Sequence, residues 1–280
     1  MFRRRLIWNG TPKAPIVDGV PVANVGDIAY KAADGSIKVI APDLWSASLG
    51  TAVGVVVIPS GFAPDNGKAR IVALVEYSSE WQTTSEDASI TNHNRVPITD
   101  NTNNTAGSYA SSGYLPSDRW ASSGTQSYVD NNAYYQSSDS DFCPSPYLNG
   151  NVNPEYYKAI SGYRNALSDF NGLSNTQTLI QSSNNKAAIL AASHVISGTE
   201  LSMYLPGMGE MGYIMARFSL INQSITKVGG TKIDTSAYYW TSTEFSSTNV
   251  YTLFTNVGRV RNTSGKTGPY AVRPFAQLDF

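Results

Sequence analysis

The sequence predicts an α+β fold in which mixed antiparallel sheets and two helices are joined by long ordered loops. Strand-like segments occur in the first third and in the last part of the chain, and a helical repeat of apolar residues lies between them. Apolar residues make up 41% of the 280 residues and charged residues only 15%, whereas about 25% is usual for the charged fraction. The 17 Tyr and 5 Trp residues favour ordered loops over disorder because they supply large apolar area.

The chain is expected to divide into an N-terminal unit over residues 1–47 and a larger domain over residues 48–280. Three prolines within the first 21 residues break any helix there, so the chain should begin as an extended arm. Residues 26–40 then alternate around an Asp-Gly turn, which predicts a short β-hairpin.

The larger domain opens with two strand signals followed by a long polar segment. Residues 53–58 form a continuous β-branched run, and residues 69–77 follow an Asp-Asn-Gly turn, which predicts a central antiparallel hairpin. Residues 78–155 are crowded with Ser, Thr, Asn, Asp and Tyr. An insertion of this length is usually functional or mobile, and its aromatic residues indicate that it folds back onto the body.

Two helices and three strands are expected in the second half of the chain. The first helix, near residues 184–195, places these apolar residues on one face: Ala187, Ala188, Leu190, Ala191 and Val195. The second begins near Pro206 and ends at Gly229-Gly230, with apolar residues at steps of three and four: Met211, Ile214, Met215, Phe218, Ile221 and Ile225. The strands are expected near residues 238–244, 250–256 and 271–278.

The charge and the apolar runs limit the expected partners. A net charge of -1 offers no general attraction to nucleic acid or to anionic membranes. No run approaches the roughly 18 apolar residues that span a membrane. Residues 1–7 begin like an export signal, but the apolar region that such a signal needs is missing. We therefore expect the protein to stay in the cytoplasm where it is made until assembly or lysis.

No catalytic residue, metal site or cofactor is predicted. Cys143 is the single cysteine, which excludes a disulfide within the chain and a Cys-rich zinc site. His93 and His194 lack the spacing to other ligands that a zinc site requires. A pair of catalytic carboxylates stays open because their separation cannot be read from a sequence. Asp139 and Asp141 fit a solvated loop better than such a pair.

Four segments in the second half of the chain carry a family resemblance. They are, in chain order, DFNGLSNT at 169–176, MYLPGMGEM at 203–211, YWTSTE at 239–244 and VRPF at 272–275. Together they resemble the bacterial and phage branch of the C-type lectin fold, which includes formylglycine-generating enzymes and proteins diversified by retroelements. The resemblance implies a C-type lectin-like domain, a rigid scaffold whose members mostly bind other molecules.

The residue types in these segments predict structural roles. Trp240 should fill the core between a sheet and the second helix, with its indole nitrogen bonded to a neighbour. Glu210 and Glu244 should bond backbone amides or Arg273, and Arg273 should hold a fixed carboxylate partner. Oxidase members of the family depend on copper-binding cysteines, and animal members bind sugar through a calcium motif. This sequence lacks both features.

Ligand contact is expected on the face formed by residues 245–270, which carries ligand contacts in family members. The candidate residues are Phe245, Thr248, Asn249, Tyr251, Arg259, Arg261, Thr263, Lys266 and Tyr270. Tyrosine and arginine beside small polar groups combine rigid aromatic area with adaptable hydrogen bonding. An ordinary solvated sheet edge explains the same residues, and both interpretations stay open.

The first residues form a basic and aromatic head that is the candidate attachment segment. Its members are Phe2, Arg3, Arg4, Arg5 and Trp8. Such a segment either frays in solvent or docks into a partner and orders on binding. Its Met-Phe-Arg-Arg-Arg-Leu start, joined to a domain of this kind, is similar to virion proteins of crAss-like phages of gut bacteria.

The resemblance implies a non-enzymatic structural protein of a phage virion, such as a head fibre, a capsid decoration or a tail fibre. It would attach to a glycan or protein on the host surface, and its arm would contact other virion proteins. The chains would form a homo-oligomer, a trimer or a dimer, because closed symmetry multiplies weak contacts. Alternatives are a surface adhesin of a gut bacterium and, less favoured, a carbohydrate-active enzyme.

Overall fold

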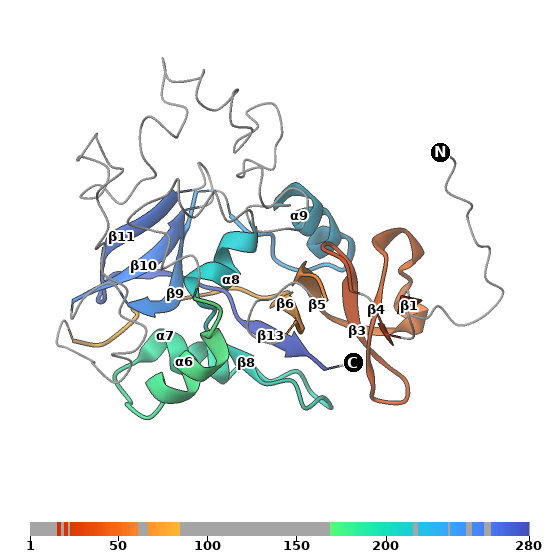
Figure 1. Cartoon of the computed structure of the whole chain (residues 1–280), viewed down its shortest axis with the longest axis horizontal. Helices are drawn as coiled ribbons and strands as arrows, with labels where there is room; N and C mark the ends of the chain where they lie inside the picture. Colours follow the sequence, from red (N-terminus) through yellow and green to blue (C-terminus); the bar gives the residue numbers. More distant parts are fainter. Residues whose placement is uncertain are drawn as a thin grey trace, which may run out of the picture.

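Two large β-sheets with α-helices packed beside them make up the described part of the chain (Figure 1). The computed structural model describes residues 16–17, 20–21, 23–60, 67–84, 169–214, 218–234, 236–244, 248–254 and 259–279. Within these residues the fold is α+β, as the sequence predicts. The predicted insertion lies outside the described residues from residue 85 onward, and so does the arm up to residue 15.

The first sheet has six strands in the order β4-β3-β5-β6-β13-β8, all paired antiparallel. Their bounds are β3 Ile28–Ala32, β4 Ile37–Ile40, β5 Gly50–Ile58, β6 Ala69–Ala73, β8 Met203–Tyr204 and β13 Phe275–Leu278. Both hairpins expected in the first half are confirmed, because β3 pairs with β4 and β5 pairs with β6. Gly54 is needed in β5 because a Cβ there would lie 2.7 Å from the Val72 carbonyl oxygen.

Strand pairing crosses the boundary expected at residue 47. β3 from the N-terminal unit pairs with β5 of the larger domain, with Ala29 opposite Gly54. Two short 3-10 helices, η1 Pro42–Leu44 and η2 Ala47–Leu49, connect β4 to β5. The hairpin over residues 28–40 is therefore part of the first sheet. A separate two-stranded sheet precedes it, formed by β1 Ile16–Val17 and β2 Val20–Pro21.

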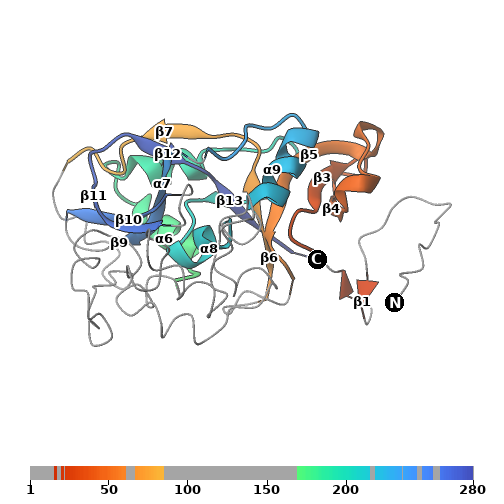
Figure 2. The same cartoon turned by 90° about the horizontal axis from the view of Figure 1, so that it is seen from above.

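The second sheet has five strands in the order β11-β10-β9-β12-β7. Their bounds are β7 Tyr77–Ser79, β9 Tyr238–Glu244, β10 Asn249–Phe254, β11 Arg259–Gly265 and β12 Tyr270–Val272. The single strand expected over residues 271–278 is instead two strands, because the chain leaves the second sheet after β12 and enters the first as β13. Pro274 lies between them and has no N–H to continue a ladder, while its carbonyl accepts the Ala73 N–H at 2.8 Å. Figure 2 shows this passage between the sheets.

Four helices are described: α6 Gly172–Leu179, α7 Lys186–Ala192, α8 Met208–Gly212 and α9 Phe218–Lys227. The first expected helix is α7. The sequence analysis predicts no helix at α6, which overlaps the resemblance segment at 169–176. The second expected helix is α8 followed by α9, and residues 215–217 between them are not described. In Figure 1, α6 and α7 lie below the second sheet and α9 lies beside β5.

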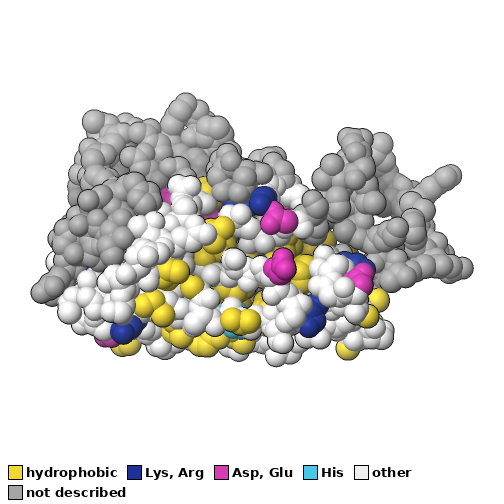
Figure 3. Space-filling model, turned by 90° about the horizontal axis from the view of Figure 1, so that it is seen from below, with side chains coloured by type: hydrophobic (Ala, Val, Ile, Leu, Met, Phe, Trp, Pro, Cys, Tyr) yellow, Lys and Arg dark blue, Asp and Glu magenta, His cyan; other side chains and the backbone are white. Residues whose placement is uncertain are grey.

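Charged side chains are sparse on one broad face of the molecule. Figure 3 shows hydrophobic side chains there interspersed with uncharged polar groups. This surface agrees with the 15% charged composition. Large exposed hydrophobic side chains of the described residues are Leu44, Ile180 and Val195, which lie far apart in the sequence, and single exposed apolar residues of this kind are common on folded domains.

Trp240 is fully buried, as the sequence predicts. Its indole N–H donates to the Ser79 carbonyl at 2.8 Å. The apolar cluster around it is formed by Trp81, Leu179, Ala187, Ala188, Ala191, Leu205, Val250 and Val272. These residues bring in α6 and α7, so the expectation that Trp240 packs on the second helix is wrong. Trp81, expected within the long insertion, belongs to this core, and its indole N–H donates to the Thr241 carbonyl at 2.9 Å.

Replacing Trp240 with alanine is expected to lower the free energy of unfolding by about 3–5 kcal/mol, because it removes a fully buried ring and leaves a cavity. Urea unfolding followed by circular dichroism measures this change. Leu44→Ala is the control, because Leu44 is 59% exposed and a surface change of this kind costs less than about 0.5 kcal/mol. Equal losses for the two variants would show that Trp240 does not support the core.

Candidate functional site

A buried network of polar side chains joins three of the four resemblance segments. Asp169 Oδ2 accepts hydrogen bonds from Asn175 Nδ2 at 3.0 Å and from Thr243 Oγ1 at 2.6 Å. Thr243 Oγ1 in turn accepts the Met208 N–H at 2.8 Å. Asn175 Nδ2 also donates to Ser242 Oγ at 3.1 Å. These contacts connect α6, the start of α8 and strand β9, so the network has a structural role.

Glu210 is fully buried and also has a structural role. Its carboxylate accepts the Gly207 N–H at 2.8 Å, the Tyr204 hydroxyl at 2.8 Å and Arg70 Nε at 3.0 Å. The expected bond to a backbone amide is confirmed, while the arginine partner is Arg70 and not Arg273. Burial raises the pKa of Glu210 to about 7, although Arg70, Gly207 and Tyr204 act in the opposite direction.

Glu244 and Lys266 form an ion pair in the interior. Lys266 Nζ lies 2.5 Å from Glu244 Oε1, and both side chains have no solvent exposure. The same nitrogen lies 4.8 Å from the centroid of the Trp81 ring, which adds a cation–π contact. Lys266 was expected on an exposed face, and that expected exposure is wrong because its charge neutralises the buried Glu244 carboxylate.

Tyr251 is a second ligand-binding candidate that the structure places in the interior. Burial raises the pKa of the Tyr251 hydroxyl. Tyr251 is buried because α8 contacts β10. Val250 on the same strand belongs to the cluster around Trp240. Both faces of β10 are therefore covered at this point, and the alternation of a strand with one solvated face does not apply.

Three candidates retain solvent exposure. Thr248 is exposed, and Asn249 and Tyr270 are half-buried. The Thr248 hydroxyl donates to Asn249 Oδ1 at 2.7 Å. The Tyr270 ring packs 4.7 Å from the Trp240 ring and 5.3 Å from the Tyr238 ring, centroid to centroid. This arrangement fixes Tyr270 on the scaffold while part of its ring still meets solvent.

The remaining candidates lie outside the described side chains. Phe245 is not described, and of Arg259, Arg261 and Thr263 only the backbone in β11 is described. β11 is an outer strand of the second sheet and pairs with β10. The attachment candidates Phe2, Arg3, Arg4, Arg5 and Trp8 also lie outside the described residues, as do Cys143, His93, Asp139 and Asp141.

Arg273 has a carboxylate partner, as the sequence predicts, and the partner is Glu76. Arg273 Nη1 lies 3.5 Å from Glu76 Oε2, and Nη2 donates to the Thr231 carbonyl at 2.5 Å. The Tyr239 hydroxyl donates to Glu76 Oε2 at 2.6 Å and accepts the Asp234 N–H at 2.7 Å. Burial raises the pKa of Tyr239, and Glu76 raises it further. The cluster fixes the loop that follows α9.

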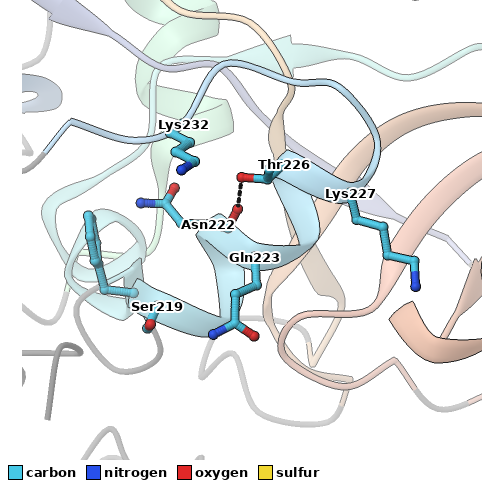
Figure 4. Close-up of a pocket in the computed structure, with 7 residues that line it drawn as sticks. Ser219, Asn222, Gln223, Thr226, Lys227 and Lys232 are labelled. Carbon is cyan, nitrogen blue, oxygen red and sulfur yellow. Dashed lines mark hydrogen bonds between the residues drawn. The ribbon is translucent and has the colours of Figure 1, made fainter.

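A groove along the outer side of α9 was not predicted from the sequence. It has a volume of about 610 Å³, and its described lining residues are Phe218, Ser219, Asn222, Gln223, Thr226, Lys227 and Lys232. Figure 4 shows these side chains along the helix and on the loop after it. The polar residues recur at steps of three and four on the side of α9 opposite Ile221 and Ile225, so the helical repeat contained a signal for a solvated stripe but none for a groove.

The described residues contain neither a metal-ligating cluster nor a membrane-spanning helix. No group of three or more His, Cys, Asp or Glu side chains there could hold a metal ion. No described helix is long and apolar enough to cross a bilayer. His194 Nδ1 lies 2.8 Å from the Tyr77 hydroxyl, and burial lowers the pKa of His194.

The fold of this chain is similar to that of a solved structure. No protein-family model matches the sequence, and no curated protein matches it. A crystal structure of a fimbrial protein from Bacteroides ovatus is similar, with a TM-score of 0.51 and 17% sequence identity. The match covers 91% of this chain and 49% of that protein, so this chain spans about half of its length. At this identity the likeness concerns the fold alone.

Replacing Thr243 with valine is expected to lower the free energy of unfolding by about 1–3 kcal/mol. Valine has the same shape but removes the donor to Asp169 and the acceptor for the Met208 N–H, and both groups are buried. Thermal and urea unfolding measure the change. Thr226→Val is the matched control, because the Thr226 hydroxyl bonds the Asn222 carbonyl on an exposed helix face. Indistinguishable stabilities of the two variants would contradict the role of the network.

Replacing Lys266 with methionine is expected to cost about 3–5 kcal/mol of stability, because it leaves the Glu244 carboxylate buried without its cation. Adding Glu244→Gln in the same chain should recover part of the loss. The measurement is urea unfolding of the two variants beside Lys227→Met, whose lysine is exposed. A fully stable Lys266→Met protein would instead return Lys266 to the list of candidate surface residues.

Proposed function

We propose that this protein is a non-enzymatic attachment protein whose α+β domain presents a rigid surface to another molecule. The observation that carries this proposal is that the buried ionisable side chains bond other groups of the chain itself. Glu210, Glu244 and Arg273 each bond a charged partner inside the fold. Their bonding stabilises the scaffold, while the contact candidates Thr248, Asn249 and Tyr270 retain solvent exposure. The fold likeness to a fimbrial protein supports an attachment role.

The setting that we propose is the surface of a phage virion, as a head fibre, a capsid decoration or a tail fibre. The similarity of the first residues to virion proteins supports this setting. In it, the segment from Phe2 to Trp8 contacts other virion proteins, and the chains form a dimer or trimer. The printed name of the fimbrial protein supports a second candidate, an adhesin on the surface of a bacterial cell.

The contact surface that we propose is the outer part of the second sheet. It combines the exposed or half-buried Thr248, Asn249 and Tyr270 with the outer strand β11. Strand pairing to β10 holds the β11 backbone, so the surface is supported by a sheet and not by a free loop. A surface fixed in advance loses less conformational entropy on binding than a mobile one does. Its partner is a glycan or protein on the host surface.

The test is to locate the protein in a culture that contains both phage and host. Purified particles and cell envelopes are analysed by mass spectrometry and by immunogold labelling with an antibody against the full chain. We expect the protein on the outside of particles, in a fixed ratio to the capsid protein. A chain with Arg3, Arg4 and Arg5 replaced by alanine should be lost from particles, while a Lys186→Ala chain should remain.

Two results would contradict the proposal. Label on cell envelopes in a culture without particles would identify the adhesin alternative in place of the virion setting. Cleavage of a glycan by the purified chain, measured as released reducing ends on a glycan panel, would overturn the non-enzymatic role in both settings.

A further inference from the structure

The groove along α9 carries two lysine side chains that form no ion pair with any described residue. Lys227 and Lys232 are both exposed, and within the described residues neither forms an ion pair. Asp234 carries the first carboxylate after Lys232 in the sequence. It accepts hydrogen bonds from the Ser236 N–H and from the Ser236 hydroxyl, both at 2.8 Å. The groove therefore has a positive charge that its own described residues do not neutralise.

The wall that carries Lys232 is fixed by hydrogen bonds on both sides of this residue. The Thr231 N–H donates to the Leu74 carbonyl at 2.7 Å. The Asn222 side chain accepts the Ile233 N–H at 2.8 Å and donates to the Ile233 carbonyl at 3.0 Å. This pair of bonds ties the loop directly to α9, so the groove is held in shape without a ligand.

The helix that forms the floor is fixed as well. Ile221 and Ile225 are fully buried, and α9 contacts β5. The Ser224 hydroxyl donates to the Gly26 carbonyl at 2.7 Å. Ligand sites are usually largely preformed and rigidly supported, and this groove meets both conditions although its lining residues are mostly exposed.

The residues that line the groove suit a polar anionic ligand that carries hydroxyl groups. Gln223 and Thr226 are exposed and can each donate and accept hydrogen bonds. Figure 4 shows Lys232 beside Asn222 and Thr226, while Lys227 projects in a different direction from the helix. A ligand with one carboxylate therefore meets one lysine, whereas an extended ligand with repeated carboxylates meets both.

We propose that this groove binds an acidic oligosaccharide, with sugar carboxylates at Lys232 and Lys227 and sugar hydroxyls at Gln223 and Thr226. The inference rests on the proposed attachment function and names the ligand class and a second contact site for it. An acidic peptide fits less well, because its carboxylate side chains bring no hydroxyl groups for Gln223 and Thr226 to bond. Phe218, the one large apolar side chain in the described lining, is only 8% exposed.

The experiment uses trigalacturonate, a trisaccharide with a carboxylate on each sugar, and its methyl ester, which has the same sugars without the charges. Calorimetric titration of the full chain should show binding of the acid and about tenfold weaker binding of the ester. Lys232→Gln should weaken binding of the acid about tenfold and remove the preference for it over the ester. Lys227→Gln should give a smaller loss of affinity for the acid, since it retains Lys232 on the fixed wall.

Lys186→Gln, a lysine on α7 outside the groove, is the matched control and should bind as the unchanged chain does. Lys227 and Lys232 are exposed and Lys186 is half-buried, and circular dichroism checks that each variant is folded. Equal binding of the acid and the ester, absence of binding, or equal loss in Lys186→Gln would overturn the inference. Equal affinity for a triglutamate peptide would also overturn it, because charge alone would then explain binding.

This outcome is separable from a failure of the proposed function. If the protein is found on virions while Lys232→Gln has no effect on trigalacturonate binding, the attachment role stands and the groove inference fails. If the protein is absent from particles and envelopes but binds trigalacturonate through Lys232, the groove inference stands and the attachment role fails.

Discussion

The carboxylate of Asp169 is the constraint on which the arrangement of the second half depends. It bonds Asn175 in α6 and Thr243 in β9, and through Thr243 it reaches the N-terminus of α8. The Asp169 carbonyl accepts the Gly209 N–H at 2.9 Å, so one residue holds three elements that are distant in sequence. A buried carboxylate without these donors would be strongly unfavourable, which explains why the elements that supply them are packed together.

Close backbone approach is the second constraint, and it explains a glycine in the first resemblance segment. A Cβ on Gly172 would lie 2.1 Å from Glu210 Oε2 and 2.6 Å from the Gly207 nitrogen. The start of α6 therefore lies directly against the bonded Glu210 carboxylate. The segments at 169–176 and 203–211 are thus two sides of one contact.

The buried ion pairs and hydrogen bonds support the surface residues rigidly. Glu244 and Lys266 neutralise each other beneath the second sheet, and the Arg273 cluster holds the loop that carries Lys232. The surface residues are thereby presented on strands and on a fixed helix and loop. A protein that attaches one body to another benefits from such support, because binding then requires little ordering of the contact surface.

The sequence by itself determined the elements with a strong local signal: both early hairpins, helix α7, strand β9 and the burial of Trp240. Periodicity and turn residues are local properties, so the sequence alone carries them. Only the tertiary structure decided that Tyr251 and Lys266 are buried, that the last strand divides between two sheets at Pro274, and that α9 carries a groove. A strand pattern shows that two faces exist but not what covers each. Burial of Tyr251 requires α8 to contact β10, and burial of Lys266 requires Glu244 across the sheet. Those contacts join distant parts of the chain, and no local pattern encodes them.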